Sequence, residues 1–144
     1  MSSTKRLQPV ADIAKQNERN AAKRHGDVLR ESQQQQSQLD ELIQYRDQYL
    51  ERLHSAGQAG LSIVQMRDYQ SFIARLNHAI AQQKQQVLNG QQMQDESRQM
   101  LTQKQNRTRM IDKVVESRSR AEQQRTQRRE QREMDDRSHE VSSL

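Results

Sequence analysis

Apolar side chains recur at alternating intervals of three and four residues along two long parts of the chain. In the first part this spacing runs from Leu7 to Leu53, and in the second it runs from Met66 to Val115. Such intervals place the side chains on one stripe of an α-helix, which is the pattern of a coiled coil. We therefore expect one helix over about residues 5–54 and a second helix that begins at residue 62.

A short break, residues 55–61, separates the two stripes and contains Gly57 and Gly60. Ser62 and Gln65 then match a capping box, in which the two residues exchange hydrogen bonds at a helix start. A chain with one break and two matching stripes can close onto itself. The expected fold is therefore all-α: a long two-helix antiparallel coiled-coil hairpin that is monomeric on its own.

The N-terminal part of the first stripe is the least regular. We assign the stripe there to Val10, Asn17 and Ala21, followed by His25. This assignment leaves two successive intervals of four around Ala21, which predicts a stutter that locally unwinds the coiled coil.

The second stripe ends near Val115, and the residues after it are mostly charged. We expect residues 1–115 to form the hairpin and residues 116–144 to be a charged extension rich in Arg and Glu. Because this extension has almost no apolar stripe, its helix should overhang or fray.

Hydrophobic residues make up 31% of the 144 residues and aromatic residues 3%, which can fill a narrow seam but not a globular core. The chain has no Cys and no glycine-rich phosphate loop, and its four His residues show no metal-binding spacing. We expect solvated histidines, no enzymatic activity, no cofactor and no metal.

No apolar run is long enough to span a membrane, and the N-terminus lacks a signal peptide, which favours a cytoplasmic protein.

The net charge of +5 is unevenly distributed. Residues 5–30 hold seven Lys or Arg against three acidic residues, and residues 98–113 hold five against one. In an antiparallel hairpin these two segments face each other, and their combined charge favours an acidic protein partner. We expect no nucleic acid to bind there, because the four aromatic residues needed for base stacking lie at the other end.

Apolar residues are in excess close to the break, and they cannot all lie on one stripe. A second stripe follows the first on each helix, formed by Leu42, Tyr45 and Tyr49 and, after the break, by Tyr69 and Phe72. Two interpretations are open. These residues widen the core, or they form an exposed apolar and aromatic surface for a partner protein.

The same residues carry a resemblance to a known family. The pair Tyr45 and Tyr49, the glycine-bearing break, and the pattern Tyr-x-x-Phe-Ile-x-x-Leu from Tyr69 to Leu76 resemble the central part of the FliJ family. This family belongs to the bacterial flagellar type III export apparatus. The resemblance implies an antiparallel coiled coil similar to the stalk subunit of rotary ATPases.

It further implies a cytoplasmic protein that couples the hexameric flagellar export ATPase to the membrane export gate and helps to handle export chaperones. The protein could also lie at the inner membrane through that apparatus. The family's surface for the cytoplasmic part of the export gate would map onto Gln38, Leu42, Tyr45, Tyr49, Phe72, Leu76, Ala79 and Gln83.

Two other functions are compatible with the sequence. The first is a structural coiled-coil scaffold, or the stalk-like counterpart in a virulence type III secretion system. The second is a nucleic-acid-binding helical dimer, which the neutral C-terminal segment disfavours because it lacks a dense basic run.

Overall fold

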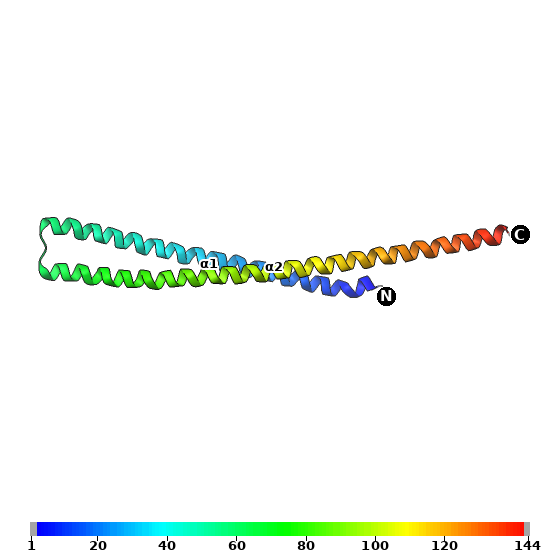
Figure 1. Ribbon diagram of the computed structural model, residues 1–144, viewed down its shortest axis with the longest axis horizontal. Coiled ribbons are helices and arrows are strands. Elements are labelled where there is room, and N and C mark those ends of the chain that lie inside the picture. Colours follow the sequence, from blue (N-terminus) through cyan, green and yellow to red (C-terminus); the bar gives the residue numbers. More distant parts are fainter. Residues whose placement is uncertain (1–2, 143–144) are drawn as a thin grey trace. The chain divides into compact units, whose positions relative to one another are not determined.

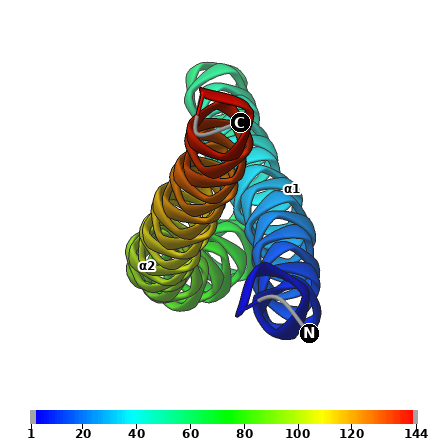
Figure 2. The ribbon, with the colours of Figure 1, turned by 90° about the vertical axis from the view of Figure 1, so that its right-hand side faces the viewer.

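The structure is a computed structural model that describes residues 3–142, so residues 1, 2, 143 and 144 of the predicted ranges lie outside it. The described residues form two α-helices, α1 (Ser3–Ala59) and α2 (Ile63–Ser142), and no strand (Figure 1 and Figure 2). The predicted fold class, a two-helix hairpin, is confirmed. α1 also continues through residues 55–59, which were expected to belong to the break.

The break between the helices is short because both helix ends are capped locally. Gly60 has a φ of 96°, a left-handed conformation that favours glycine, and its N–H donates to the Gly57 carbonyl at 3.3 Å. The predicted capping box is present. The Ser62 N–H donates to Gln65 Oε1 at 3.1 Å, and the Gln65 N–H donates to Ser62 Oγ at 3.2 Å.

The chain divides into two compact units. The hairpin unit, residues 23–99, contains the break and the flanking parts of both helices. The terminal unit contains residues 1–22 and 100–144, of which 3–22 and 100–142 are described. Within each unit a segment of α1 packs against a segment of α2.

The hairpin unit has an apolar core made of large side chains. Leu39, Ile80 and Val87 are buried together, and Leu42 and Ile43 pack against them. These contacts remove branched aliphatic side chains from water and supply the hydrophobic stabilisation of this unit.

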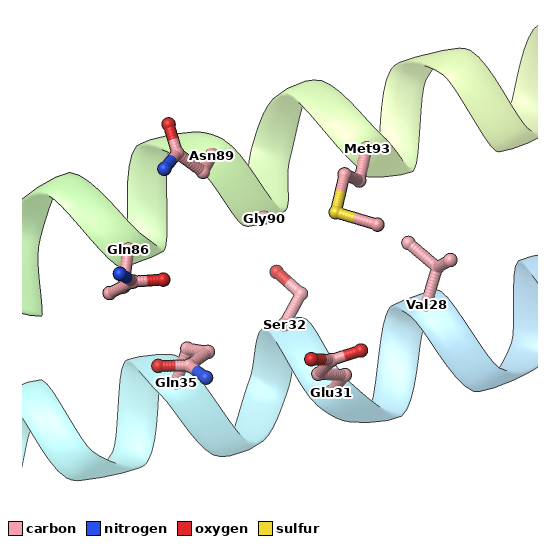
Figure 3. A pocket seen from close by; sticks show the side chains of 8 residues that line it. All are labelled: Val28, Glu31, Ser32, Gln35, Gln86, Asn89, Gly90 and Met93. Carbon is pink, nitrogen blue, oxygen red and sulfur yellow. The ribbon is translucent and has the colours of Figure 1, made fainter.

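Further from the break, the seam of the hairpin unit becomes polar and narrow. Ser32 is buried and points towards Gly90 (Figure 3). A Cβ atom built on Gly90 would lie 3.2 Å from Ser32 Oγ, so the helices approach closely there. The expectation of solvated histidines is wrong for His25, which is half-buried in the seam with its Nδ1 2.7 Å from Ser97 Oγ.

The most deeply buried side chains in the seam of the terminal unit are small, whereas its larger members, such as Leu101 and Ile111, are only half-buried. Ala11, Ala14 and Thr108 are buried, and Thr108 Oγ1 donates to the Ala14 carbonyl at 3.4 Å. The assignment of Val10 and Asn17 to the seam was wrong, since both are exposed.

The predicted stutter is absent as well. Ala11, Ala14, half-buried Glu18, Ala21 and His25 follow one another at intervals of four and three, so the heptad continues without a break. Small alanines occupy the seam because the two helices come close together, which leaves the bulkier valine outside.

Contacts between the helices continue beyond the predicted end of the seam at Val115. Ser119 and Glu122 are half-buried, and Thr4 Oγ1 donates to Glu122 Oε2 at 3.1 Å. From residue 123 to residue 142 every side chain is exposed, but the chain stays helical as far as Ser142. Of the two predicted forms of the extension, the structure has an overhanging helix.

Neither helix, within residues 3–142, offers a stretch long and apolar enough to cross a bilayer.

Candidate functional site

Four aromatic residues form one cluster near the break of the hairpin unit. Tyr45 and Tyr49 stand one turn apart on α1, with ring centroids 6.3 Å apart. From α2, Phe72 lies 4.4 Å from the Tyr49 ring and 6.2 Å from the Tyr45 ring, and Tyr69 lies 5.3 Å from Tyr49. Tilted and edge-on aromatic pairs at these distances are favourable. The cluster therefore joins the two helices and also presents ring surface to solvent.

The eight predicted site residues differ in exposure. Gln38 and Tyr45 are exposed, and Leu76 is buried in the core. The others are half-buried: Leu42, Tyr49, Phe72, Ala79 and Gln83. Leu76 and Leu42 thus widen the core, whereas Tyr45, at 46% exposed, lies on the surface.

A shallow groove of about 490 Å³ runs beside this cluster. Four predicted residues line it, namely Gln38, Leu42, Tyr45 and Gln83, together with Glu41. The sequence reasoning missed Glu41, although its place one turn after Gln38 and one turn before Tyr45 could have indicated it. The groove therefore combines an aromatic ring, an aliphatic side chain, amides and one carboxylate.

Gln83 also has a structural role. Its side-chain amide donates to the Gln35 carbonyl at 2.9 Å and to Gln35 Oε1 at 2.7 Å. These hydrogen bonds hold α2 against α1 at one end of the groove. The Gln83 amide NH2 group, which lines the groove, therefore already donates hydrogen bonds to the other helix.

The opposite edge of the hairpin unit carries a different set of side chains. Leu50 is 41% exposed on this edge, and Met66, the first residue of the predicted second stripe, is 37% exposed. On the same edge Arg46 donates to Asp47 at 3.3 Å and to Asn77 Oδ1 at 3.3 Å. This edge is aliphatic and charged, whereas the groove edge is aromatic.

The groove offers chemistry suited to binding. Its aromatic and aliphatic surfaces can take up an apolar anchor, and its amides and the Glu41 carboxylate can make hydrogen bonds at the rim. In the described part of the chain, no three His, Asp or Glu side chains are placed to hold a metal ion together.

Comparison with known proteins identifies the family. A family model described as "Flagellar FliJ protein" matches residues 3–141. Over 81 residues the chain is 36% identical to the flagellar FliJ protein of Escherichia coli (strain K12), a match that covers 56% of this chain and 55% of that protein. The chain thus spans about half the length of this curated relative. No solved structure matches the chain. Because the family model covers nearly all of it, the chain belongs to the FliJ family.

Proposed function

We propose that this member of the FliJ family is a component of the flagellar type III protein export apparatus that couples the hexameric export ATPase to the membrane export gate. In this role the aromatic groove binds the cytoplasmic part of the gate. The paired terminal segments bind the ATPase, and the chain also helps to handle export chaperones.

The observation that carries the proposal is the exposed Tyr45 ring at the edge of a groove in a flagellar family member. A two-helix hairpin has little interior, so a large aromatic side chain left in water is available to a partner. Tyrosine is also enriched among the residues that contribute most to protein–protein binding. The neighbouring ring of Phe72 fixes the position of Tyr45 from the second helix.

The proposal is tested with two matched alanine variants. Tyr45→Ala removes an exposed aromatic side chain from the groove edge, and Leu50→Ala removes a comparably exposed apolar side chain from the opposite edge. Binding to a purified cytoplasmic fragment of the export gate is measured by calorimetry, and folding by circular dichroism.

We expect Tyr45→Ala to weaken gate binding by about 2 kcal/mol, with no change in helicity. Leu50→Ala should bind as the unchanged chain does. If both variants bound the gate fragment as tightly as the unchanged chain does, the groove would have no gate-binding role. Equal loss in both would indicate a surface that is not confined to this edge.

A further inference from the structure

The terminal unit leaves several of its large apolar side chains outside its seam, although Leu7, Leu101, Ile111 and Val115 are half-buried in it. Its buried side chains, among the described residues, are Ala11, Ala14, Ala21 and Thr108. Next to them, four larger apolar side chains are between 41% and 68% exposed: Val10, Ile13, Met110 and Val114. A helix pair that only needed to bind itself would place the larger side chains inside, where their burial stabilises more.

These four side chains lie on one edge of the terminal unit. In the hairpin unit Tyr45 and Phe72 meet across one edge of the helix pair, with ring centroids 6.2 Å apart. Val10 lies five heptads before Tyr45, and Val114 lies six heptads after Phe72. The buried and half-buried positions keep alternating intervals of three and four from Ala11 to Tyr49 and from Leu76 to Val115. Val10 and Val114 therefore hold the corresponding edge positions of the terminal unit.

A second pair of residues supports this assignment. Glu31 and Met93 hold the same heptad positions, and both line one depression between the helices of the hairpin unit (Figure 3). In the terminal unit, Ile13 follows Val10 by one helical turn, and Met110 precedes Val114 by one turn. The four apolar side chains therefore form one compact patch, which we call the aliphatic edge.

The charges around the aliphatic edge have one sign. Arg6 lies one turn before Val10, Arg118 one turn after Val114, and Arg107 one turn before Met110. Over residues 3–22 and 100–122, where the two helices contact each other, the heptad positions of this edge contain no Asp or Glu. The acidic residues of these helix segments fall on other positions: Asp12, Glu18, Asp112, Glu116 and Glu122.

We propose that the aliphatic edge binds an amphipathic α-helix of a partner protein, whose apolar anchors are flanked by Asp and Glu. Such a helix would lie along α1 and α2 and complete a small three-helix core over the alanine seam. Its carboxylates would meet Arg6, Arg107 and Arg118, and guanidinium groups bind carboxylates in paired hydrogen bonds. The proposal stands on the terminal unit alone and does not require the proposed function.

A helix fits this edge better than a lipid surface. The four apolar side chains of the aliphatic edge cover only about one turn of each helix, and none is aromatic. A helix that lies in a membrane interface needs an apolar face along its length, usually with Trp or Phe. An apolar centre bordered by arginines is instead typical of a protein interface.

The test uses the full chain and two synthetic helical peptides held helical by a hydrocarbon staple. Both carry leucines at helical spacing, one with flanking glutamates and the other with flanking lysines. Fluorescence anisotropy should show binding of the glutamate peptide and much weaker binding of the lysine peptide. The double variant Ile13→Gln/Met110→Gln should weaken glutamate-peptide binding at least about tenfold.

A charge exchange gives the sharper result. Arg107→Glu/Arg118→Glu should lose the glutamate peptide and gain the lysine peptide. The control Ile63→Gln/Val64→Gln, which changes an equally exposed apolar pair in the hairpin unit, should bind as the unchanged chain does. The two edge variants and the control should all bind the gate fragment as the unchanged chain does. A failure of the aliphatic-edge proposal can therefore be told apart from a failure of the proposed function.

Three results would overturn the proposal. The first is equal binding of both peptides, or binding of neither. The second is binding to vesicles of phosphatidylserine and phosphatidylcholine that the Ile13→Gln/Met110→Gln variant abolishes while peptide binding persists unchanged. The third is a concentration-dependent dimer that the same variant abolishes, which would make a second copy of the chain the occupant.

Discussion

The hairpin unit and the terminal unit share one heptad pattern but differ in the side chains that they bury most deeply. The hairpin unit buries Leu39, Ile80 and Val87 between its helices. The terminal unit buries alanines and leaves aliphatic side chains such as Ile13 in water. Because hydrophobic stabilisation grows with the apolar area buried, the hairpin unit should hold most of the stability of the chain. The terminal unit should open more easily and gain order from a partner.

The largest effect should follow from truncating the core of the hairpin unit. Ile80 is 3% exposed, so Ile80→Ala leaves a cavity between the helices and should lower the free energy of unfolding by about 2–4 kcal/mol. Urea unfolding followed by circular dichroism measures this loss. Ile13→Ala, in the terminal unit, should cost little because its side chain is already in water. Equal losses in the two variants would contradict the contrast between the units.

A smaller and local effect is expected in the alanine seam. Ala14 is 4% exposed and its carbonyl accepts a hydrogen bond from Thr108, so a larger side chain there must push the helices apart. Ala14→Leu should cost about 1–3 kcal/mol through overpacking. Hydrogen exchange should speed up at residues 100–122 and stay unchanged at residues 63–99.

Ala22→Leu is the matched control, because Ala22 is exposed and the same change should leave exchange as it was. If Ala14→Leu instead slowed exchange in the terminal unit, the seam would have room for a larger side chain. The close approach of the two helices would then not be what selects alanine.

The alanine seam also shows where sequence reasoning succeeds and where it fails. The two helices, the capping box and the aromatic stripes are local features that periodicity and side-chain type determine. The choice between Val10 and Ala11 for the seam depends instead on how closely the helices approach, which no single helix encodes. Hydrophobicity alone predicts that Val10 lies in the seam, but in the structure the smaller Ala11 is buried there and Val10 is exposed.

The candidate site shows the same division. The aromatic cluster and the exposed Tyr45 follow from spacing along each helix. The burial of Leu76 and the exposure of Leu50 depend on the rotation of one helix against the other. Glu41 was missed because attention to apolar and aromatic residues overlooks a carboxylate at the rim of a groove.

An intermediate effect is expected from Phe72, which belongs both to the cluster and to the surface. Its ring contacts Tyr49 at 4.4 Å and Tyr45 at 6.2 Å, and each aromatic pair contributes about 0.5–1.5 kcal/mol. Phe72→Ala should therefore lower the free energy of unfolding by at least about 1 kcal/mol, but by less than Ile80→Ala because the ring is only half-buried, and the chain should stay folded. Thermal melting compares it with Leu88→Ala, an exposed apolar residue whose truncation should be neutral. A loss as large as that of Ile80→Ala would place Phe72 in the core.

The smallest effect should come from removing the end of α2. Every described side chain after Glu122 is exposed, and hydrogen bonds there, such as that from Gln131 to Asp135, join residues of the same exposed helix. Deleting residues 123–144 should therefore leave the melting temperature unchanged within error.

Deleting residues 116–144 removes in addition half-buried Ser119 and the hydrogen bond from Thr4 to Glu122, and should lower the free energy of unfolding by up to about 1 kcal/mol. Identical melting of the two truncated chains would mean that the contacts beyond Val115 add no stability. Destabilisation by the shorter deletion would show that the exposed helix supports the terminal unit.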